Sequence, residues 1–190
     1  MIEYEKIFTK EECEKIINFS QITNEDINFD FSNYPNASYE KNRIVFTKAA
    51  SFNVYIVDNN ENTEWMFNKL INWFSEKSGV KFNKEIKHQS CTLHNYIIGD
   101  NFSKHIDLSK GFEERRYNLG IQLNEEYDGG EYICYDKNGD SILLPKETGT
   151  ALFYHCRVPH EIKKITNGNR WSIVMPILNW EIIEENKILI

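Results

Sequence analysis

Cysteine is scarce in this chain. Four cysteines, at positions 13, 91, 134 and 156, are spread over 190 residues, and no Cys-x-x-Cys pair occurs. Thiols so few and so widely spaced do not form a disulfide framework. We expect them to be free and buried, in a protein of a reducing compartment.

Long apolar runs and a basic excess are also lacking. No apolar run approaches the roughly 18 to 20 residues that span a bilayer, and residues 1–6 are charged where a signal peptide needs an apolar core. The formal net charge is −7 and the pI is about 5.3, so the chain is a poor non-specific partner for phosphate backbones or anionic lipid. We expect a cytoplasmic protein without a membrane partner. The charge argues against nucleic acid, although Arg115 and Arg116 leave a local basic patch open.

The chain does contain enough apolar surface for one folded unit. Hydrophobic residues make up 41% of the sequence and aromatic residues 14%, and no stretch is of low complexity. Length and composition together predict a single domain over residues 1–190.

Two helices are predicted in the first half of the chain. Thr9 stands three residues before Glu12, the spacing of a capping box, and apolar residues follow at helical intervals. A second helix is expected over residues 62–78, where large apolar side chains recur every three to five residues and Gly79 provides a stop. Residues 43–57 read as extended chain. Residues 21–42 are rich in Asn, Asp and Ser and are predicted to form a loop.

The pattern changes from residue 84 onward. Short apolar runs alternate with turn signals at residues 100–101, 128–130, 137–140 and 166–169. Many short strands at this spacing indicate an antiparallel sandwich or barrel. Gly129 and Gly130 are expected to form a tight turn with a close backbone approach. The predicted class is α+β, with N-terminal helical support over about 1–80 and a β core over about 84–180.

His105 and Asp107 are the first candidates for chemistry. Side chains two residues apart in an extended chain project from the same face. An imidazole and a carboxylate placed in this way can take adjacent positions around one metal. Because His-x-Asp also occurs by chance in many proteins, the pair needs a further ligand.

His160, far downstream, is the candidate for that ligand. Two histidines and one carboxylate on one face of a metal form the facial triad of non-haem iron(II) oxygenases, which leaves three coordination positions open. Two open positions suit a chelating oxo-acid and the last one suits oxygen. His155 lies near His160 and is the alternative. His88 and His94 are expected to be packed or surface histidines.

Arg170 and Ser172 are candidates for a carboxylate clamp. On a strand the two side chains share a face, and a guanidinium fork matches a carboxylate bidentately while a hydroxyl adds a donor. A dicarboxylic cosubstrate whose other end chelates iron would require such a clamp. Trp171 should face the opposite side of the strand and belong to the core.

With these motifs in this order, residues 91–176 resemble the 2-oxoglutarate/iron(II)-dependent dioxygenase superfamily, and especially its prolyl 4-hydroxylase-like branch. Besides the metal and clamp motifs, the matching pieces are Tyr96 with Gly99, Leu123-Asn124 with Gly129-Gly130-Glu131, and Gly149 with Phe153. Residues 7–13 also resemble the start of that branch. The distance to Arg170 in the family favours His160 over His155 as the metal ligand.

The resemblance implies a double-stranded β-helix, or jelly-roll, core flanked by N-terminal helices. It implies iron(II), 2-oxoglutarate and oxygen as cofactor and cosubstrates, with ascorbate as a supporting reductant. The iron ligands that it implies are His105, Asp107 and His160.

The resemblance also implies how 2-oxoglutarate is held. It assigns the distal carboxylate to Arg170 and a cosubstrate contact to Tyr96, and Ser172 and Gln122 are further candidate contacts. Collagen-type prolyl 4-hydroxylases usually carry lysine where Arg170 stands. A tyrosine of the family is replaced at Ile121-Gln122, so these two positions depart from that subgroup.

The implied reaction is hydroxylation of an unactivated C–H bond, with release of succinate and carbon dioxide. A prolyl or other amino-acid residue of a peptide or protein, or a free amino acid, is the expected substrate. Asp107 argues against halogenation, because related halogenases have a small residue at that position. Oxidative demethylation of nucleic acid, or a non-catalytic sensor that binds metal and 2-oxoglutarate, are the alternatives. Residues 21–42 and 108–116 are candidate substrate-covering segments, and the sequence indicates no oligomeric state.

Overall fold

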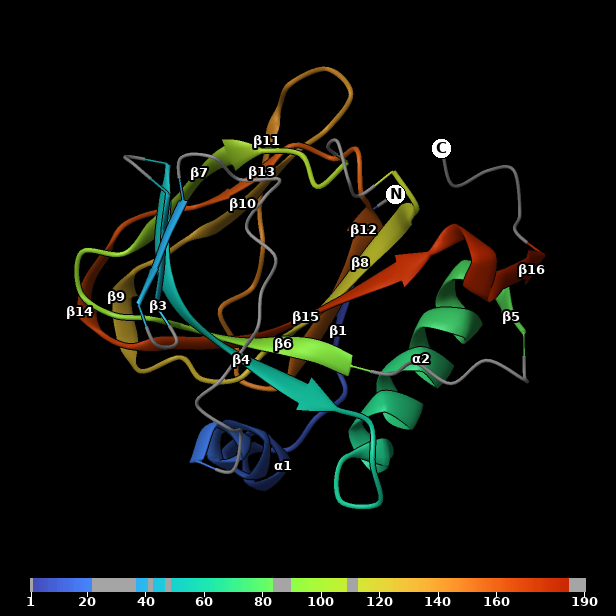
Figure 1. Ribbon diagram of the computed structural model, residues 1–190. Coiled ribbons are helices and arrows are strands. Elements are labelled where there is room, and N and C mark those ends of the chain that lie inside the picture. Colours follow the sequence, from blue (N-terminus) through green and yellow to red (C-terminus); the bar gives the residue numbers. More distant parts are fainter. Residues whose placement is uncertain are drawn as a thin grey trace.

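Antiparallel strands dominate the molecule (Figure 1). A computed structural model describes residues 2–21, 37–40, 43–46, 49–83, 90–108 and 113–184. In these residues twelve strands join one sheet and two α-helices cover part of it. No helix of this described part is long and apolar enough to cross a membrane.

The main sheet is antiparallel throughout its length. Its order is β1 (Ile2–Lys6), β12 (Thr150–His155), β8 (Arg115–Gln122), β15 (Arg170–Leu178), β6 (Ser90–Tyr96), β4 (Ala50–Asp58), β7 (Asn101–His105), β13 (His160–Ile162), β10 (Tyr132–Tyr135) and β11 (Ser141–Leu143). β3 (Arg43–Phe46) adds to β4, and β2 (Ala37–Glu40) adds to β3. The sheet curls until β7, β13 and β10 lie across from β6 and β15 (Figure 1). This confirms the predicted jelly roll.

Two small ladders and two short helices complete the described fold. β9 (Tyr127–Gly129) pairs with β14 (Ile165–Gly168), and β5 (Lys81–Phe82) pairs with β16 (Ile182–Glu184). The 3₁₀ helices are η1 (Asn18–Gln21) and η3 (Asn179–Glu181). Residues 166–168, predicted as part of a turn, lie in β14 instead, and this strand ends at Gly168, whose φ is 69°.

The predicted helices are confirmed, with small shifts at their ends. α1 (Lys10–Ile17) begins with the expected capping box: the amide of Glu12 donates to Thr9 Oγ1 over 3.2 Å, and the amide of Thr9 donates to the Glu12 carboxylate over 2.8 Å. α2 (Glu64–Ser78) ends at Gly79, whose φ of 71° places it in the left-handed region. The amide of Gly79 donates to the carbonyl of Ser75 over 2.9 Å, which satisfies one of the free acceptors at the end of the helix.

The N-terminal part is less helical than the division at residue 80 suggests. β1 pairs with β12 and therefore belongs to the core sheet. The extended reading of residues 43–57 is confirmed by β3 and β4. Within the predicted loop 21–42, residues 37–40 form β2, so that part of the loop prediction is wrong. Residues 22–36, 41 and 42 lie outside the described part.

Alternation along the strands divides the sheet into two faces. One face packs against α1 and α2 through a large apolar cluster. Leu93, Leu119 and Ile173 on β6, β8 and β15 belong to it. Trp171 packs against this cluster, on the predicted side of β15, and its ring stacks on that of Tyr55 with centroids 6.0 Å apart. Side chains at the alternate positions point to the curled interior. The helices thus support the outer face of the same strands that carry the candidate site.

The glycine-rich turn at 128–130 has the predicted close approach. Gly129 has φ 70°, and a β-carbon there would overlap the carbonyl oxygen of Lys164. Gly149, with φ 88°, is under the same constraint against the carbonyl of Phe8. Both positions accept only glycine without a shift of the backbone.

Candidate active site

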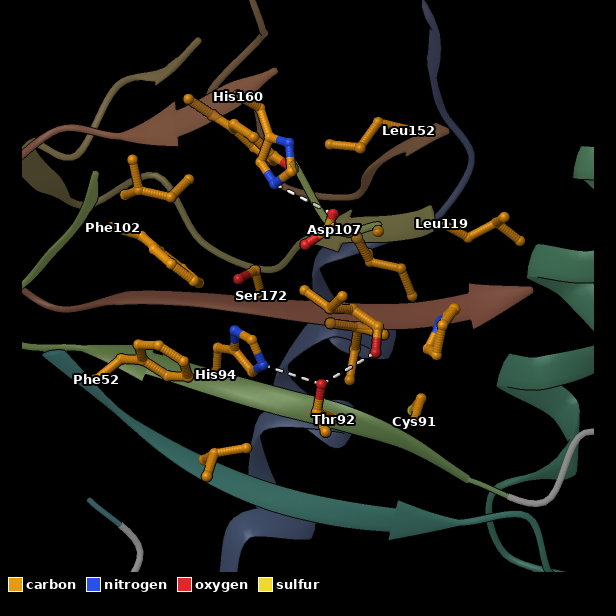
Figure 2. Close-up of a pocket in the computed structure, with 18 of the residues that line it drawn as sticks. Phe52, Cys91, Thr92, His94, Phe102, Asp107, Leu119, Leu152, His160 and Ser172 are labelled. Atoms are coloured by element: carbon orange, nitrogen blue, oxygen red, sulfur yellow. Dashed lines mark hydrogen bonds and ion pairs between the residues drawn. The ribbon is translucent and has the colours of Figure 1, made fainter. Parts of the chain in front are cut away.

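A pocket of about 320 Å³ lies inside the curled sheet. Figure 2 shows side chains from both halves of the sheet converging on it. His105, Asp107 and His160 lie at one part of its wall, and Arg170 lies at another. Much of the remaining lining is apolar and includes Ile44, Phe52, Val54, Ile56, Leu152, Val174 and Pro176.

Pairing between strands brings the three candidate metal ligands together. β7 pairs with β13, and His105 lies directly opposite His160, while Asp107 follows just after the end of β7. His105 Nε2 lies 3.5 Å from Asp107 Oδ1, and His160 Nε2 lies 3.3 Å from Asp107 Oδ2. The three ligand atoms all lie within 4.8 Å of one another. Bonds of about 2.1 Å put adjacent ligands about 3 Å apart, so this donor set fits one face of a metal ion.

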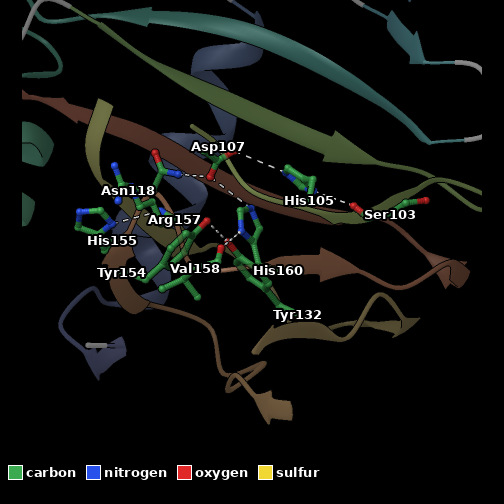
Figure 3. Close-up of polar contacts among 10 residues, drawn as sticks. All are labelled: Ser103, His105, Asp107, Asn118, Tyr132, Tyr154, His155, Arg157, Val158 and His160. Carbon is green, nitrogen blue, oxygen red and sulfur yellow. Dashed lines mark hydrogen bonds and ion pairs between the residues drawn. The ribbon is translucent and has the colours of Figure 1, made fainter. Parts of the chain in front are cut away.

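Backbone carbonyls fix the orientation of both imidazole rings. His105 Nδ1 lies 2.7 Å from the carbonyl oxygen of Ser103, and His160 Nδ1 lies 3.0 Å from that of Val158 (Figure 3). A carbonyl oxygen only accepts hydrogen bonds, so each Nδ1 carries the proton and donates it. Each Nε2 is then left with a lone pair toward Asp107, the tautomer that a metal ligand requires.

Asp107 is held by the chain on two sides. Its amide donates to the carbonyl of Cys156 over 3.0 Å, and its carboxylate accepts a hydrogen bond from Asn118 Nδ2 (Figure 3). Burial alone would raise the pKa of Asp107, but the neighbouring His105 and His160 side chains lower it below its usual value. The carboxylate is therefore ionised, as metal binding requires.

His160 is buried and is packed between aromatic rings. Burial lowers its pKa, which outweighs the opposing effect of Asp107 and favours the neutral ring. Tyr154 and Tyr132 lie beside it, with ring centroids 4.9 Å and 5.9 Å away, and their hydroxyl groups are hydrogen-bonded to each other. Burial raises the pKa of both tyrosines, so both stay protonated.

Arg170 is a buried cation, and no carboxylate of the described residues forms an ion pair with it. Its Nη1 donates to Ser172 Oγ and its Nη2 to Gln122 Oε1, each over 2.9 Å. Nε is buried and has no hydrogen-bond partner in the described part of the chain. A guanidinium has five N–H groups, so the N–H of Nε and further N–H groups of the fork remain for a ligand. This donor set fits a carboxylate.

Tyr96 and Gln122 lie at this clamp in different roles. The ring of Tyr96 is centred 5.4 Å from Arg170 Cζ and is buried. Gln122 uses its amide nitrogen on the carbonyl of Asn124 (2.6 Å) and on the hydroxyl of Tyr127 (2.9 Å). Both of its N–H groups are thus engaged, and Gln122 orients Arg170 rather than offering a donor of its own.

The remaining histidines differ in their surroundings. His155 is buried, and its Nδ1 accepts a hydrogen bond from the backbone amide of Arg157 over 3.2 Å. It does not belong to the cluster of His105, Asp107 and His160. His94 is packed, as predicted, but it also lines the pocket. His88 lies outside the described residues. So do residues 109–112 of the predicted substrate-covering segment 108–116.

Sequence reasoning missed four residues of the site: His94, Asn118, Tyr132 and Tyr154. Period-two alternation carries a signal for some of them. His94 shares the strand face of Tyr96, and Asn118 shares that of Gln122. The two tyrosines have no such signal: the place of Tyr132 beside His160 depends on the pairing of β10 with β13, and Tyr154 lies on β12, which pairs with β1 and β8 instead.

Three comparisons with known proteins bear on this site. Residues 91–177 match the family model of the 2OG-Fe(II) oxygenase superfamily. The match spans every residue of the triad and of the clamp. Among curated proteins, no sequence relative is found.

Solved structures share the fold at low sequence identity. A prolyl-4-hydroxylase from Pseudomonas putida has a TM-score of 0.65 and 13% identity, and the match covers 93% of this chain and 91% of that one. A prolyl hydroxylase from Trichoplax adhaerens, in complex with a peptide fragment of the hypoxia inducible factor oxygen degradation domain, has a TM-score of 0.68 and 15% identity over 94% and 83%. A viral collagen prolyl hydroxylase from Paramecium Bursaria Chlorella virus-1 has a TM-score of 0.59 and 14% identity over 92% and 94%.

The family match lies over the part of the chain that builds the pocket, and the fold extends the likeness to nearly the whole chain. Iron(II), 2-oxoglutarate and oxygen are the cofactor and cosubstrates of this family. Residues 91–177 therefore form a domain of the 2OG-Fe(II) oxygenase superfamily, and the chain is a 2-oxoglutarate-dependent dioxygenase.

Proposed function

We propose that this chain is a hydroxylase whose iron ligands are His105, Asp107 and His160. The observation that carries the proposal is the convergence of these three donors in the wall of a pocket that also contains the buried Arg170. When bound, iron and 2-oxoglutarate supply the oxidising chemistry that the protein groups lack.

Arg170 holds the distal carboxylate of 2-oxoglutarate in this proposal. The guanidinium is buried, its fork is fixed by Ser172 and Gln122, and it keeps free N–H groups. No carboxylate of the described residues pairs with Arg170, and a bound dicarboxylate would supply the missing negative charge. Tyr96 packs beside the same group.

A C–H bond of an amino-acid side chain is the proposed target. The pocket wall away from the triad and the clamp is mostly apolar, which suits an aliphatic group such as a prolyl ring. One solved structure of this fold holds a peptide, so a peptide or protein substrate is the first choice, and a free amino acid is the second.

Succinate formation tests the proposal. The purified protein would be incubated with iron(II), ascorbate, oxygen and 2-oxoglutarate, alongside His105→Ala and His160→Ala. His155→Asn is the matched control, because it changes a neighbouring buried histidine outside the triad. We expect succinate from the wild type and the control and none from the two ligand variants.

The opposite results are informative. Equal succinate from His160→Ala and the wild type would contradict the ligand assignment. If no protein forms succinate, binding of 2-oxoglutarate to the metal-loaded protein decides: binding without turnover, even with peptide substrates added, favours a sensor, and the absence of binding refutes the proposal.

A further inference from the structure

His94 has an unsatisfied nitrogen in the wall of the pocket. Its side chain is about nine-tenths buried and is stacked on Phe52, with ring centroids 4.6 Å apart. Nε2 lies 2.9 Å from Thr92 Oγ1 (Figure 2). Nδ1 is buried and has no hydrogen-bond partner among the described residues. A buried polar atom without a partner is costly, so a ligand that supplies a partner for this nitrogen would bind favourably here.

The position of His94 connects the clamp with the triad. It lies directly across the strand pair from Ser172, which accepts a hydrogen bond from Arg170. Burial and the charge of Arg170 lower the pKa of His94 to about 3, while Asp107 acts in the opposite direction. The ring is therefore neutral and carries one proton, within electrostatic reach of both parts of the site.

Thr92 decides which nitrogen of His94 carries that proton. Its hydroxyl also lies 3.1 Å from the carbonyl oxygen of Val174. If Thr92 donates to Val174, His94 donates through Nε2 and its Nδ1 is an acceptor. If Thr92 donates to His94 Nε2 instead, Nδ1 carries the proton and is a donor. The pocket can change between these states without changing its charge.

A bound 2-oxo acid decides between the two states. 2-Oxoglutarate presents only oxygen acceptors, and His94 lines the same pocket as Arg170 and the triad. We propose that His94 is a further cosubstrate-binding residue: its Nδ1–H donates to an oxygen of 2-oxoglutarate while the hydroxyl of Thr92 donates to Nε2. This inference rests on the proposed function.

Binding of 2-oxoglutarate under anaerobic conditions tests the inference without turnover. Calorimetry on manganese(II)-loaded protein would compare the wild type with His94→Leu, His94→Asn and Arg170→Leu. A hydrogen bond to a charged group is worth enough to change affinity about ten-fold or more. We expect His94→Leu to weaken the Kd by that factor and His94→Asn, whose amide can donate, to restore most of it. The Kd for manganese should be unchanged.

The proton itself gives a second readout on the unmodified protein. Nitrogen-15 NMR of zinc(II)-loaded protein with 2-oxoglutarate should place the His94 proton on Nδ1. A proton that remains on Nε2, or wild-type affinity in His94→Leu, would overturn the inference. If Arg170→Leu loses binding and His94→Leu does not, the inference alone fails. If the wild type does not bind 2-oxoglutarate, the proposed function fails with it.

Discussion

Replacing Arg170 with leucine should remove the thermal stabilisation that 2-oxoglutarate gives the protein. The guanidinium is only 2% exposed and keeps N–H groups for a carboxylate. Two charge-assisted hydrogen bonds are worth about 1.5–3 kcal/mol each. Their loss should weaken binding by at least about 100-fold.

The size of the thermal effect follows from linkage. A ligand present at 100 times its Kd stabilises the folded state by about 2.7 kcal/mol, and one present at its Kd by about 0.4 kcal/mol. For a chain of this length, 1 kcal/mol raises Tm by about 2–4 °C. The wild type should therefore gain about 5–11 °C, and Arg170→Leu only about 1–2 °C at the same ligand concentration.

Scanning calorimetry on manganese-loaded protein checks this prediction. 2-Oxobutyrate, which lacks the distal carboxylate, is the matched ligand control and should shift wild type and variant equally. Arg170→Lys should fall between the two proteins, because it keeps the charge and loses the fork. A full shift by 2-oxoglutarate in Arg170→Leu would refute the carboxylate role.

Three further predictions concern the scaffold and the metal ligand. Gly139→Ala should lower the free energy of unfolding by about 1–2 kcal/mol, the cost of a left-handed backbone without glycine. Gly149→Ala should lower it by more, because a β-carbon at Gly149 would also meet a backbone carbonyl. Equal losses for the two variants in urea melts would contradict this. Burial raises the pKa of Glu12, but its hydrogen bonds with Lys69 and with the backbone of Thr9 have a larger opposite effect, and the pKa lies below the usual value of 4.5. The contribution of Glu12 to the free energy of unfolding is therefore present above pH 4.5 and is lost as pH falls through the lower folded pKa. Glu12→Gln should therefore cost about 0.2–1 kcal/mol at pH 7 and nothing in strong acid, as acid-dependent melts would reveal. Asn118→Ala should weaken metal binding about 10- to 100-fold, measured by competition with a chelator, and unchanged affinity would exclude a role in holding the ligand carboxylate.

Local patterns in the sequence carry much of the fold. The capping box at Thr9 and the stop at Gly79 act within a few residues, so α1 and α2 are predictable from neighbouring positions alone. The strand at residues 37–40 escapes prediction because a short polar edge strand lacks a clear apolar alternation. Its partner is the next strand along the chain, β3, which in turn pairs with β4.

The site divides in the same way. Spacing predicts that His105 and Asp107 share one face, and the structure has their ligand atoms 3.5 Å apart. The contact of Asn118 with Asp107 is not predictable, because it joins strand β8 to the end of β7 across the curled sheet. Register between strands distant in sequence sets such contacts, and no spacing within one strand encodes it.

The division of β15 into two faces has a consequence for how this enzyme can diversify. Its residues Ile173 and Met175 belong to the helix-packed cluster, and Ile173 also contributes to the pocket wall, whereas Val174 and Pro176 line the pocket outside that cluster. Replacing the second group leaves the first in place. New substrate preferences can therefore be selected from a small library at alternate positions of one strand, with the apolar foundation of the enzyme held constant.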